Sequence, residues 1–200
     1  MKPVFEKFFL SSLASLGLAT STSAASLEAR LDEGTGTITI HRDGLTKPLV
    51  TQHAAAHHRP YLHPIVGPDG NGVLTEYSPG HHKHQTGLYW GFTRVNGRDY
   101  FHHPADNYWG RKGVKVLEAR GESVKWETVY DLLDADGNAV LTETQRWTMR
   151  SDNNRHILDL EWHGRGQTDV TIGKYNYGGL FLRMPWKPVT KGEAVNAARN

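Results

Sequence analysis

Cysteine is absent from this sequence of 200 residues. Without thiols the chain forms no disulfide bond, offers no thiolate nucleophile and holds neither an iron–sulfur cluster nor a cysteine-type zinc site. An excess of one charge is also missing, because 23 Lys and Arg residues balance 21 Asp and Glu residues to a net charge of +2. That balance argues against a nucleic-acid partner or a membrane-surface partner. No apolar run is as long as a membrane span.

The first 25 residues have the pattern of a secretory signal. Lys2 and Lys7 give a positive start, an apolar run covers residues 8–19, and small residues precede Ala24 and Ala25. We therefore expect residues 1–25 to be a signal peptide, and the mature chain to be secreted or periplasmic with no membrane partner. Six Trp, eight Tyr and six Phe residues can stabilise such a chain by packing alone.

Short alternating segments separated by turn residues dominate the rest of the sequence. Residues 35–44 alternate and end in Asp-Gly, and residues 67–72 read GPDGNG, a turn in which Pro fixes one φ angle and Gly permits positive φ. Residues 88–103 carry aromatic side chains on both sides of Asn96-Gly97. This arrangement predicts a β-hairpin with its bend at that pair.

Residues 114–163 predict a meander of antiparallel strands. Within it Val124, Trp126 and Tyr130 occupy alternate positions, so their side chains share one apolar face. Two more strands are expected around Gly178-Gly179, where the glycine pair indicates a bend or a close backbone approach. The sequence therefore predicts an all-β fold, an antiparallel β-sandwich formed by a single domain over residues 26–200.

Nine of the twelve histidines cluster in three segments, HAAAHHRPYLHP, HHKH and HHP. Imidazole titrates near neutral pH, exchanges hydrogen bonds and ligates metals. His82 and His84 are two residues apart, so they would point to the same side of a strand. With His63, or alternatively His102 or His103, they would ligate a divalent metal if one is bound. No His-Glu-x-x-His motif is present, and we predict no cofactor apart from that metal.

Acid–base catalysis is a second interpretation of these histidines, because a neutral imidazole is a competent general acid or base near pH 7. A carboxylate partner would come from Asp69, Glu76, Asp99, Asp106, Glu143, Asp159 or Glu161. Arg59 and Arg183 stand in apolar or aromatic surroundings. An arginine in such a place either ties strands together or faces an anion or a sugar hydroxyl.

Sugar binding is a third interpretation and uses the same residues. Ligand sites combine aromatic walls with a few polar groups that fix orientation, and Tyr89, Trp90, Gln85 and Asn107 are of those types. Trp109 lies in a turn segment, which predicts an exposed or cleft-lining ring. Core packing is the alternative explanation for the aromatic residues.

Residues 58–80, 81–103 and 174–186 together resemble an exported bacterial family of uncharacterised function, called PmoA-like or methane oxygenase PmoA. The family motif Arg-Pro-Tyr-x-His-Pro is matched by RPYLHP, which starts at Arg59. The family's histidine-rich stretch before Gly-Leu-Trp-Trp-Gly is matched by HHKHQTGLYWG. Here Tyr89 replaces the first Trp of that stretch, and Gln85-Thr86 stands where the family more often has Arg.

The resemblance implies a fold similar to the galactose mutarotase-like supersandwich, with a sugar as the natural ligand. It also implies that these 200 residues are the N-terminal part of a longer domain. Methane oxidation is not expected, because the subunit behind the family label is a multi-span membrane protein and this sequence has no such spans.

We therefore expect an exported carbohydrate-active protein that performs acid–base chemistry, of the epimerase, lyase or hydrolase type, on a small-molecule or oligosaccharide ligand. The expected catalytic residues are His63, His82 and His84. The expected ligand-binding residues are Arg59, Tyr61, Gln85, Trp90, His102, His103 and Arg183. A non-catalytic sugar-binding module and a histidine-ligated metalloprotein are the alternatives. All three hypotheses require separate strands to bring Arg59, His63, His82 and His84 to one cavity.

Overall fold

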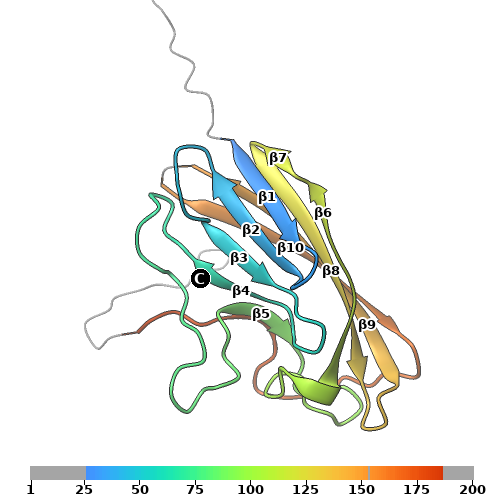
Figure 1. Ribbon diagram of the computed structural model, residues 1–200. Helices are drawn as coiled ribbons and strands as arrows, with labels where there is room; N and C mark the ends of the chain where they lie inside the picture. Colours follow the sequence, from blue (N-terminus) through green and yellow to red (C-terminus); the bar gives the residue numbers. More distant parts are fainter. Residues whose placement is uncertain (1–25, 153, 187–200) are drawn as a thin grey trace, which may run out of the picture.

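The computed structural model describes residues 26–152 and 154–186 of the chain, so the predicted signal peptide lies outside the described residues. The described residues form two antiparallel sheets, shown in Figure 1 with β1 to β5 in front of the long strands β8, β9 and β10. Their helical content is one 3₁₀ turn, η1, at Asp106–Tyr108. In this part of the chain no helix is long and apolar enough to cross a bilayer. The prediction of an all-β sandwich of antiparallel sheets is confirmed.

The larger sheet has seven strands in the order β11-β5-β4-β3-β2-β1-β7. Its first four strands along the chain are neighbours in space and pair antiparallel. Two late segments complete it, since β7 pairs with β1 at one edge and β11 pairs with β5 at the other. The strands are β1 Leu27–Asp32, β2 Thr37–Arg42, β3 Val50–His53, β4 Tyr61–Ile65, β5 Leu88–Gly91, β7 Arg120–Gly121 and β11 Gly179–Leu182.

The smaller sheet is the predicted meander, in the order β10-β9-β8-β6. Its strands are β6 Trp109–Glu118, β8 Ser123–Leu133, β9 Ala139–Ser151 and β10 His156–Gly166. Val124, Trp126 and Tyr130 are all fully buried, as the alternation predicts. The turn between β8 and β9 is closed by Asp134, whose side chain accepts hydrogen bonds from backbone N–H groups of the loop.

The core fills the space between the two sheets. Trp126 of β8 and Trp147 of β9 are register partners, and their rings stack with centroids 6.5 Å apart. They pack with apolar side chains of the larger sheet, among them Leu62 and Leu88. The Trp126 indole donates a buried hydrogen bond of 3.1 Å to Gln52 Oε1. Each such aromatic side chain removes a large area from water, which is how a chain without disulfides holds its sheets together.

The expected hairpin over residues 88–103 forms only in part. Asn96 and Gly97 make the predicted tight turn, with φ of 49° and 79°. The second arm does not become a strand, because the Asp99 carboxylate accepts hydrogen bonds of 3.0 Å from the backbone N–H groups of Phe101 and His102. Local side-chain bonds of this kind compete with a sheet ladder, so this segment folds as a loop.

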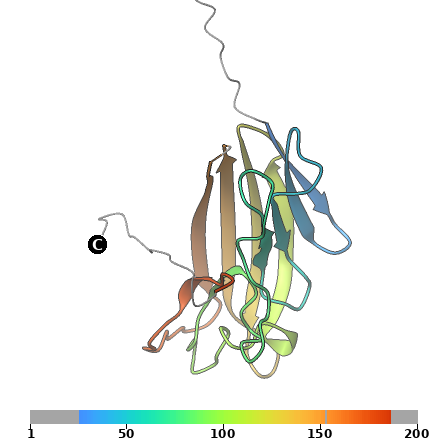
Figure 2. The ribbon, with the colours of Figure 1, turned by 90° about the vertical axis from the view of Figure 1, so that its left-hand side faces the viewer.

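Trp109 corrects another expectation, because its ring is fully buried instead of exposed. It begins β6, packs edge-on against Tyr100 and Tyr130, and donates from Nε1 to the carbonyl of His103. Figure 2 shows that the loop around residue 100 (green) and β11 (red) lie at the same, lower end of the molecule. Residues far apart in sequence therefore meet there.

Candidate active site

One face of the larger sheet carries three aromatic residues, among them Tyr61 and Tyr89, which the sequence analysis named. Tyr61, Tyr89 and Phe181 stand opposite one another on β4, β5 and β11, and directly opposed residues project to the same face of a sheet. Leu62 and Leu88 are the next pair and belong to the core. Tyr61, Tyr89 and Phe181 therefore face away from the core. The loop after β5 packs against this outer face, with the Phe101 ring 5.3 Å from the Tyr89 ring.

A cavity of about 290 Å³ opens on this outer face. We call it the histidine pocket; its lining residues are His82, His84, Gln85, Phe101, His102, Tyr177 and Phe181. The imidazole rings of His84 and His102 are 4.6 Å apart, and those of His82 and His84 are 5.9 Å apart. Three imidazoles from two separate segments thus share one cavity with a tyrosine hydroxyl.

His82 and His84 reach the pocket by a route that the sequence did not predict. Residues 81–85 are not part of a strand. Successive turns shape them, with the N–H of His82 donating to Pro79 O at 2.8 Å and the N–H of Gln85 donating to His82 O at 3.0 Å. The strand argument for their common direction is therefore wrong, although both side chains do line the same cavity.

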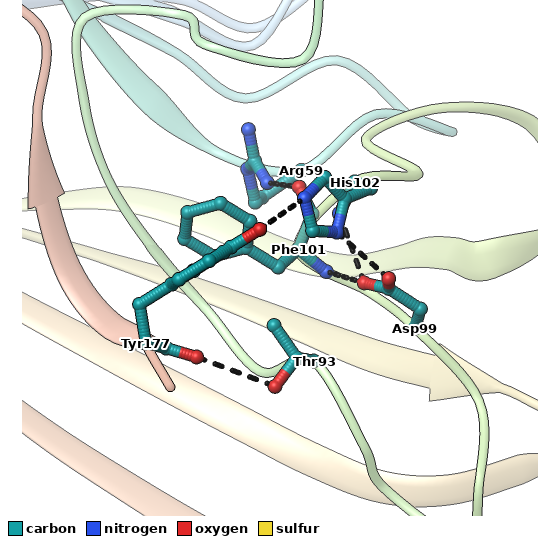
Figure 3. Close-up of polar contacts among 6 residues, drawn as sticks. All are labelled: Arg59, Thr93, Asp99, Phe101, His102 and Tyr177. Carbon is teal, nitrogen blue, oxygen red and sulfur yellow. Dashed lines mark hydrogen bonds and ion pairs between the residues drawn. The ribbon is translucent and has the colours of Figure 1, made fainter. Parts of the chain in front are cut away.

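A chain of hydrogen bonds crosses the pocket wall (Figure 3). Asp99 Oδ2 lies 2.7 Å from His102 Nδ1, and His102 Nε2 lies 3.0 Å from the Tyr177 hydroxyl. When the Asp99 carboxylate accepts the Nδ1 proton of an uncharged ring, Nε2 is left as an acceptor. Tyr177 is then the donor, and its O–H is polarised by an imidazole that a carboxylate holds in place. This arrangement has the logic of a catalytic triad with tyrosine at its outer end.

His84 and Tyr177 differ in their electrostatic surroundings. Burial, together with the neighbouring His102 and Arg59, lowers the pKa of His84 to about 4. His84 is therefore neutral at pH 7, able to accept or donate a hydrogen bond without carrying charge. Desolvation and the neighbouring Tyr175 raise the pKa of Tyr177 above its ordinary value, so its hydroxyl keeps its proton unless a base draws it away.

Arg59 lies behind the pocket wall and not in the pocket. Its side chain is fully buried, and its guanidinium donates to the backbone carbonyls of Phe101 and His84 and lies 3.5 Å from the centre of the Tyr89 ring. Burial lowers its pKa to about 10, so it remains a cation at neutral pH. Through these contacts Arg59 holds the loop and the histidine segment against the sheet. This is the structural role that the sequence analysis gave as the alternative to ligand binding.

His63 and Tyr61 belong to a second cluster on the same sheet face, outside the histidine pocket. His63 Nδ1 lies 2.9 Å from Thr75 Oγ1, and the Tyr61 ring packs 5.6 Å from that of Tyr77. The His53 ring stacks on Tyr61 at 4.7 Å. The structure therefore separates the expected catalytic set: His82 and His84 meet, while His63 lies apart from them. The single cavity expected for Arg59, His63, His82 and His84 is not formed.

Of the remaining predicted residues, some line the histidine pocket and others lie outside it. Gln85 lines the pocket, and its buried Oε1 has no hydrogen-bond partner among the described residues. Trp90 projects to the opposite side of β5, where it stacks on Trp162 at 5.3 Å. His103 stacks on Tyr108 outside the pocket, and Arg183 forms an ion pair of 2.7 Å with Glu76. Within residues 26–152 and 154–186, no group of three or more His, Asp or Glu side chains has an arrangement that could hold a metal ion.

Sequence comparison gives this chain a family. Residues 37–200 match a family of unknown function, DUF6807. The chain belongs to the DUF6807 family. No curated protein and no solved structure matches the chain. Any function of this DUF6807 protein must therefore be argued from the site itself.

Sequence reasoning did not identify two residues of this site. Asp99 was one of seven candidate carboxylates, and Tyr177 was not considered although it stands beside the glycine pair. Gly178 and Gly179 take φ angles of 155° and 89°, a backbone that turns the chain from Tyr177 into β11. Glu143, another of the seven, is enclosed in the core and 1% exposed, so it takes no direct part in the pocket.

Proposed function

We propose that this DUF6807 protein is an exported carbohydrate-active enzyme that transfers protons at a sugar, with the chemistry of a lyase, hydrolase or epimerase. The observation that carries the proposal is the Asp99–His102–Tyr177 chain of hydrogen bonds at the edge of the histidine pocket. Such an arrangement serves proton transfer, because each group fixes the tautomer and direction of the next. The aromatic walls Phe101 and Phe181 suit the apolar face of a sugar ring.

The proton moves in a defined direction in this proposal. The Tyr177 oxygen takes a proton from the substrate while the phenolic proton passes to His102 Nε2, and the Asp99 carboxylate stabilises the imidazolium that results. His84 is neutral and lies beside His102, so it holds a substrate oxygen by a hydrogen bond. The unpartnered Gln85 amide oxygen is available to a sugar hydroxyl after a small side-chain rotation.

A non-catalytic sugar-binding module is the second candidate. The raised pKa of Tyr177 favours it, because a phenol that resists ionisation is a poorer base at neutral pH. In a module the same hydrogen-bonded chain would only fix the direction of the Tyr177 ring.

Tyr177→Phe distinguishes the two, since it removes one hydroxyl and keeps the ring. The mature protein is incubated with reducing sugars and oligosaccharides, and turnover and binding are measured in parallel. For the enzyme, turnover falls by about 10²–10⁴-fold while affinity changes little. The matched control is Tyr77→Phe, a similarly exposed tyrosine outside the pocket, which retains full turnover. Equal turnover for wild type and Tyr177→Phe on every substrate would remove the enzyme proposal.

A further inference from the structure

A second cavity, of about 470 Å³, shares Tyr177 with the histidine pocket and includes Trp90, which projects to the opposite side of β5. We call it the aromatic groove; its side chains come from Trp90, Phe92, Thr93, Ile172, Tyr175, Asn176 and Tyr177. Tyr177 lines both cavities. The two cavities are thus neighbours through one residue, and that residue carries the hydroxyl bonded to His102.

Tyr177 is held from several sides where the cavities meet. Its hydroxyl is bonded to His102, its backbone carbonyl accepts a 3.3 Å hydrogen bond from Thr93 Oγ1, and its ring meets that of Tyr175 at 5.0 Å. Trp90, deeper in the groove, is fixed by its stack on Trp162. These contacts give the groove a defined shape, although Tyr175 itself is 41% exposed.

The groove differs chemically from the histidine pocket. Its walls are aromatic rings, Ile172, Thr93, one amide and the glycines 173, 178 and 179, and no acidic side chain of the described chain lines it. Aromatic rings and an amide suit an uncharged ring with an apolar face and hydroxyl edges.

We propose that the ligand is an oligosaccharide that crosses Tyr177, with one sugar unit in the histidine pocket and the next unit in the aromatic groove. This inference rests on the proposed function and narrows it. The linkage between the two units lies beside the Tyr177 hydroxyl, so the reaction acts at or next to a glycosidic bond. A free monosaccharide fills only half of the site.

Calorimetry with ligands of increasing length tests this inference. Cello-, xylo-, manno- and chito-oligosaccharides and oligouronates of one to six units are titrated into the mature protein. We expect affinity to rise at least tenfold between one and two units in the series that fits. Tyr175→Ala and Asn176→Ala each lower the affinity for two or more units by about tenfold, the loss of roughly one good contact, and leave the affinity for one unit unchanged. Tyr77→Ala, outside both cavities, changes neither affinity.

The outcomes separate the inference from the proposal beneath it. Equal affinity for one unit and for longer chains overturns the inference and leaves the sugar-binding pocket standing. The same holds if Tyr175→Ala and Asn176→Ala weaken short and long ligands equally. No binding by any saccharide of any length overturns both. Both substituted side chains are exposed, and a thermal melt of each variant verifies that the fold is intact.

Discussion

The buried carboxyl of Glu143 makes the stability of this protein depend on pH in a calculable way. Its two oxygens accept hydrogen bonds from Gln145 Nε2 at 2.7 Å and from Trp162 Nε1 at 3.0 Å. Burial outweighs these bonds and the attraction of Arg59, and raises the pKa of Glu143 from 4.5 to about 7. The folded state therefore binds this proton more tightly than the unfolded state. The associated stability is complete below pH 4.5 and is lost as the pH rises through 7.

The size of the effect follows from the shift. With each pKa unit worth about 1.4 kcal/mol, the shift of Glu143 amounts to about 3 kcal/mol of unfolding free energy between low pH and pH 8. Glu143→Gln removes the titration and keeps the shape of the side chain. A cost of repositioning the new amide is the same at every pH, so only the slope of stability against pH reports the ionisation.

Urea unfolding of wild type and Glu143→Gln at pH 5, 6, 7 and 8 measures that slope. Between pH 5 and pH 8 wild type should lose about 2–3 kcal/mol relative to the variant. Histidines with lowered pKa values, such as His84, titrate in both proteins and cancel in the difference. Parallel curves for the two proteins would refute the assignment of a raised pKa to Glu143.

Three further predictions concern the site and its support. Asp99→Asn should lower turnover by 10²-fold or more with little change in melting temperature, because the tautomer of His102 is then no longer fixed; unchanged turnover would exclude the relay. Arg59→Met should destabilise the protein by about 3 kcal/mol or more, because two buried carbonyl groups lose their hydrogen-bond donor. Arg183→Met, at a half-buried ion pair, should cost about 1 kcal/mol or less. Urea midpoints measure both losses, and equal losses would contradict the structural role of Arg59. Gly179→Ala should cost about 1–2 kcal/mol, since φ is 89° there; a thermal melt without a shift would contradict this.

The alternation of apolar residues predicted a sandwich of antiparallel sheets, although one strand, β11, forms where two were expected around Gly178-Gly179. The period-2 pattern along β8 identifies the face that packs in the core, and Asn96-Gly97 identifies a turn by its φ requirements. These are local signals, and the structure confirms them. The second arm of the hairpin failed because Asp99 bonds to the backbone of its own loop, a competition that alternation does not reveal.

The site was only partly predictable because its parts meet through loops. The sequence singled out His82, His84 and His102 by type, but their contact depends on turns at residues 79–85 and on the loop held by Asp99. Tyr177 approaches from the strand pairing of β11 with β5, a long-range contact without a local pattern. Arg59 has the surroundings of a ligand-binding arginine in sequence, and only its burial reveals the supporting role.

The pairing of β11 with β5 also determines when the histidine pocket becomes complete during folding. Phe181 belongs to β11, the last strand of the described chain, and Tyr177 directly precedes that strand. His82, His84 and His102 are synthesised 75 to 95 residues before Tyr177. The Asp99–His102–Tyr177 chain of hydrogen bonds is therefore incomplete until β11 has joined the sheet. Under the proposed function, proton transfer starts only when the larger sheet gains this final edge strand.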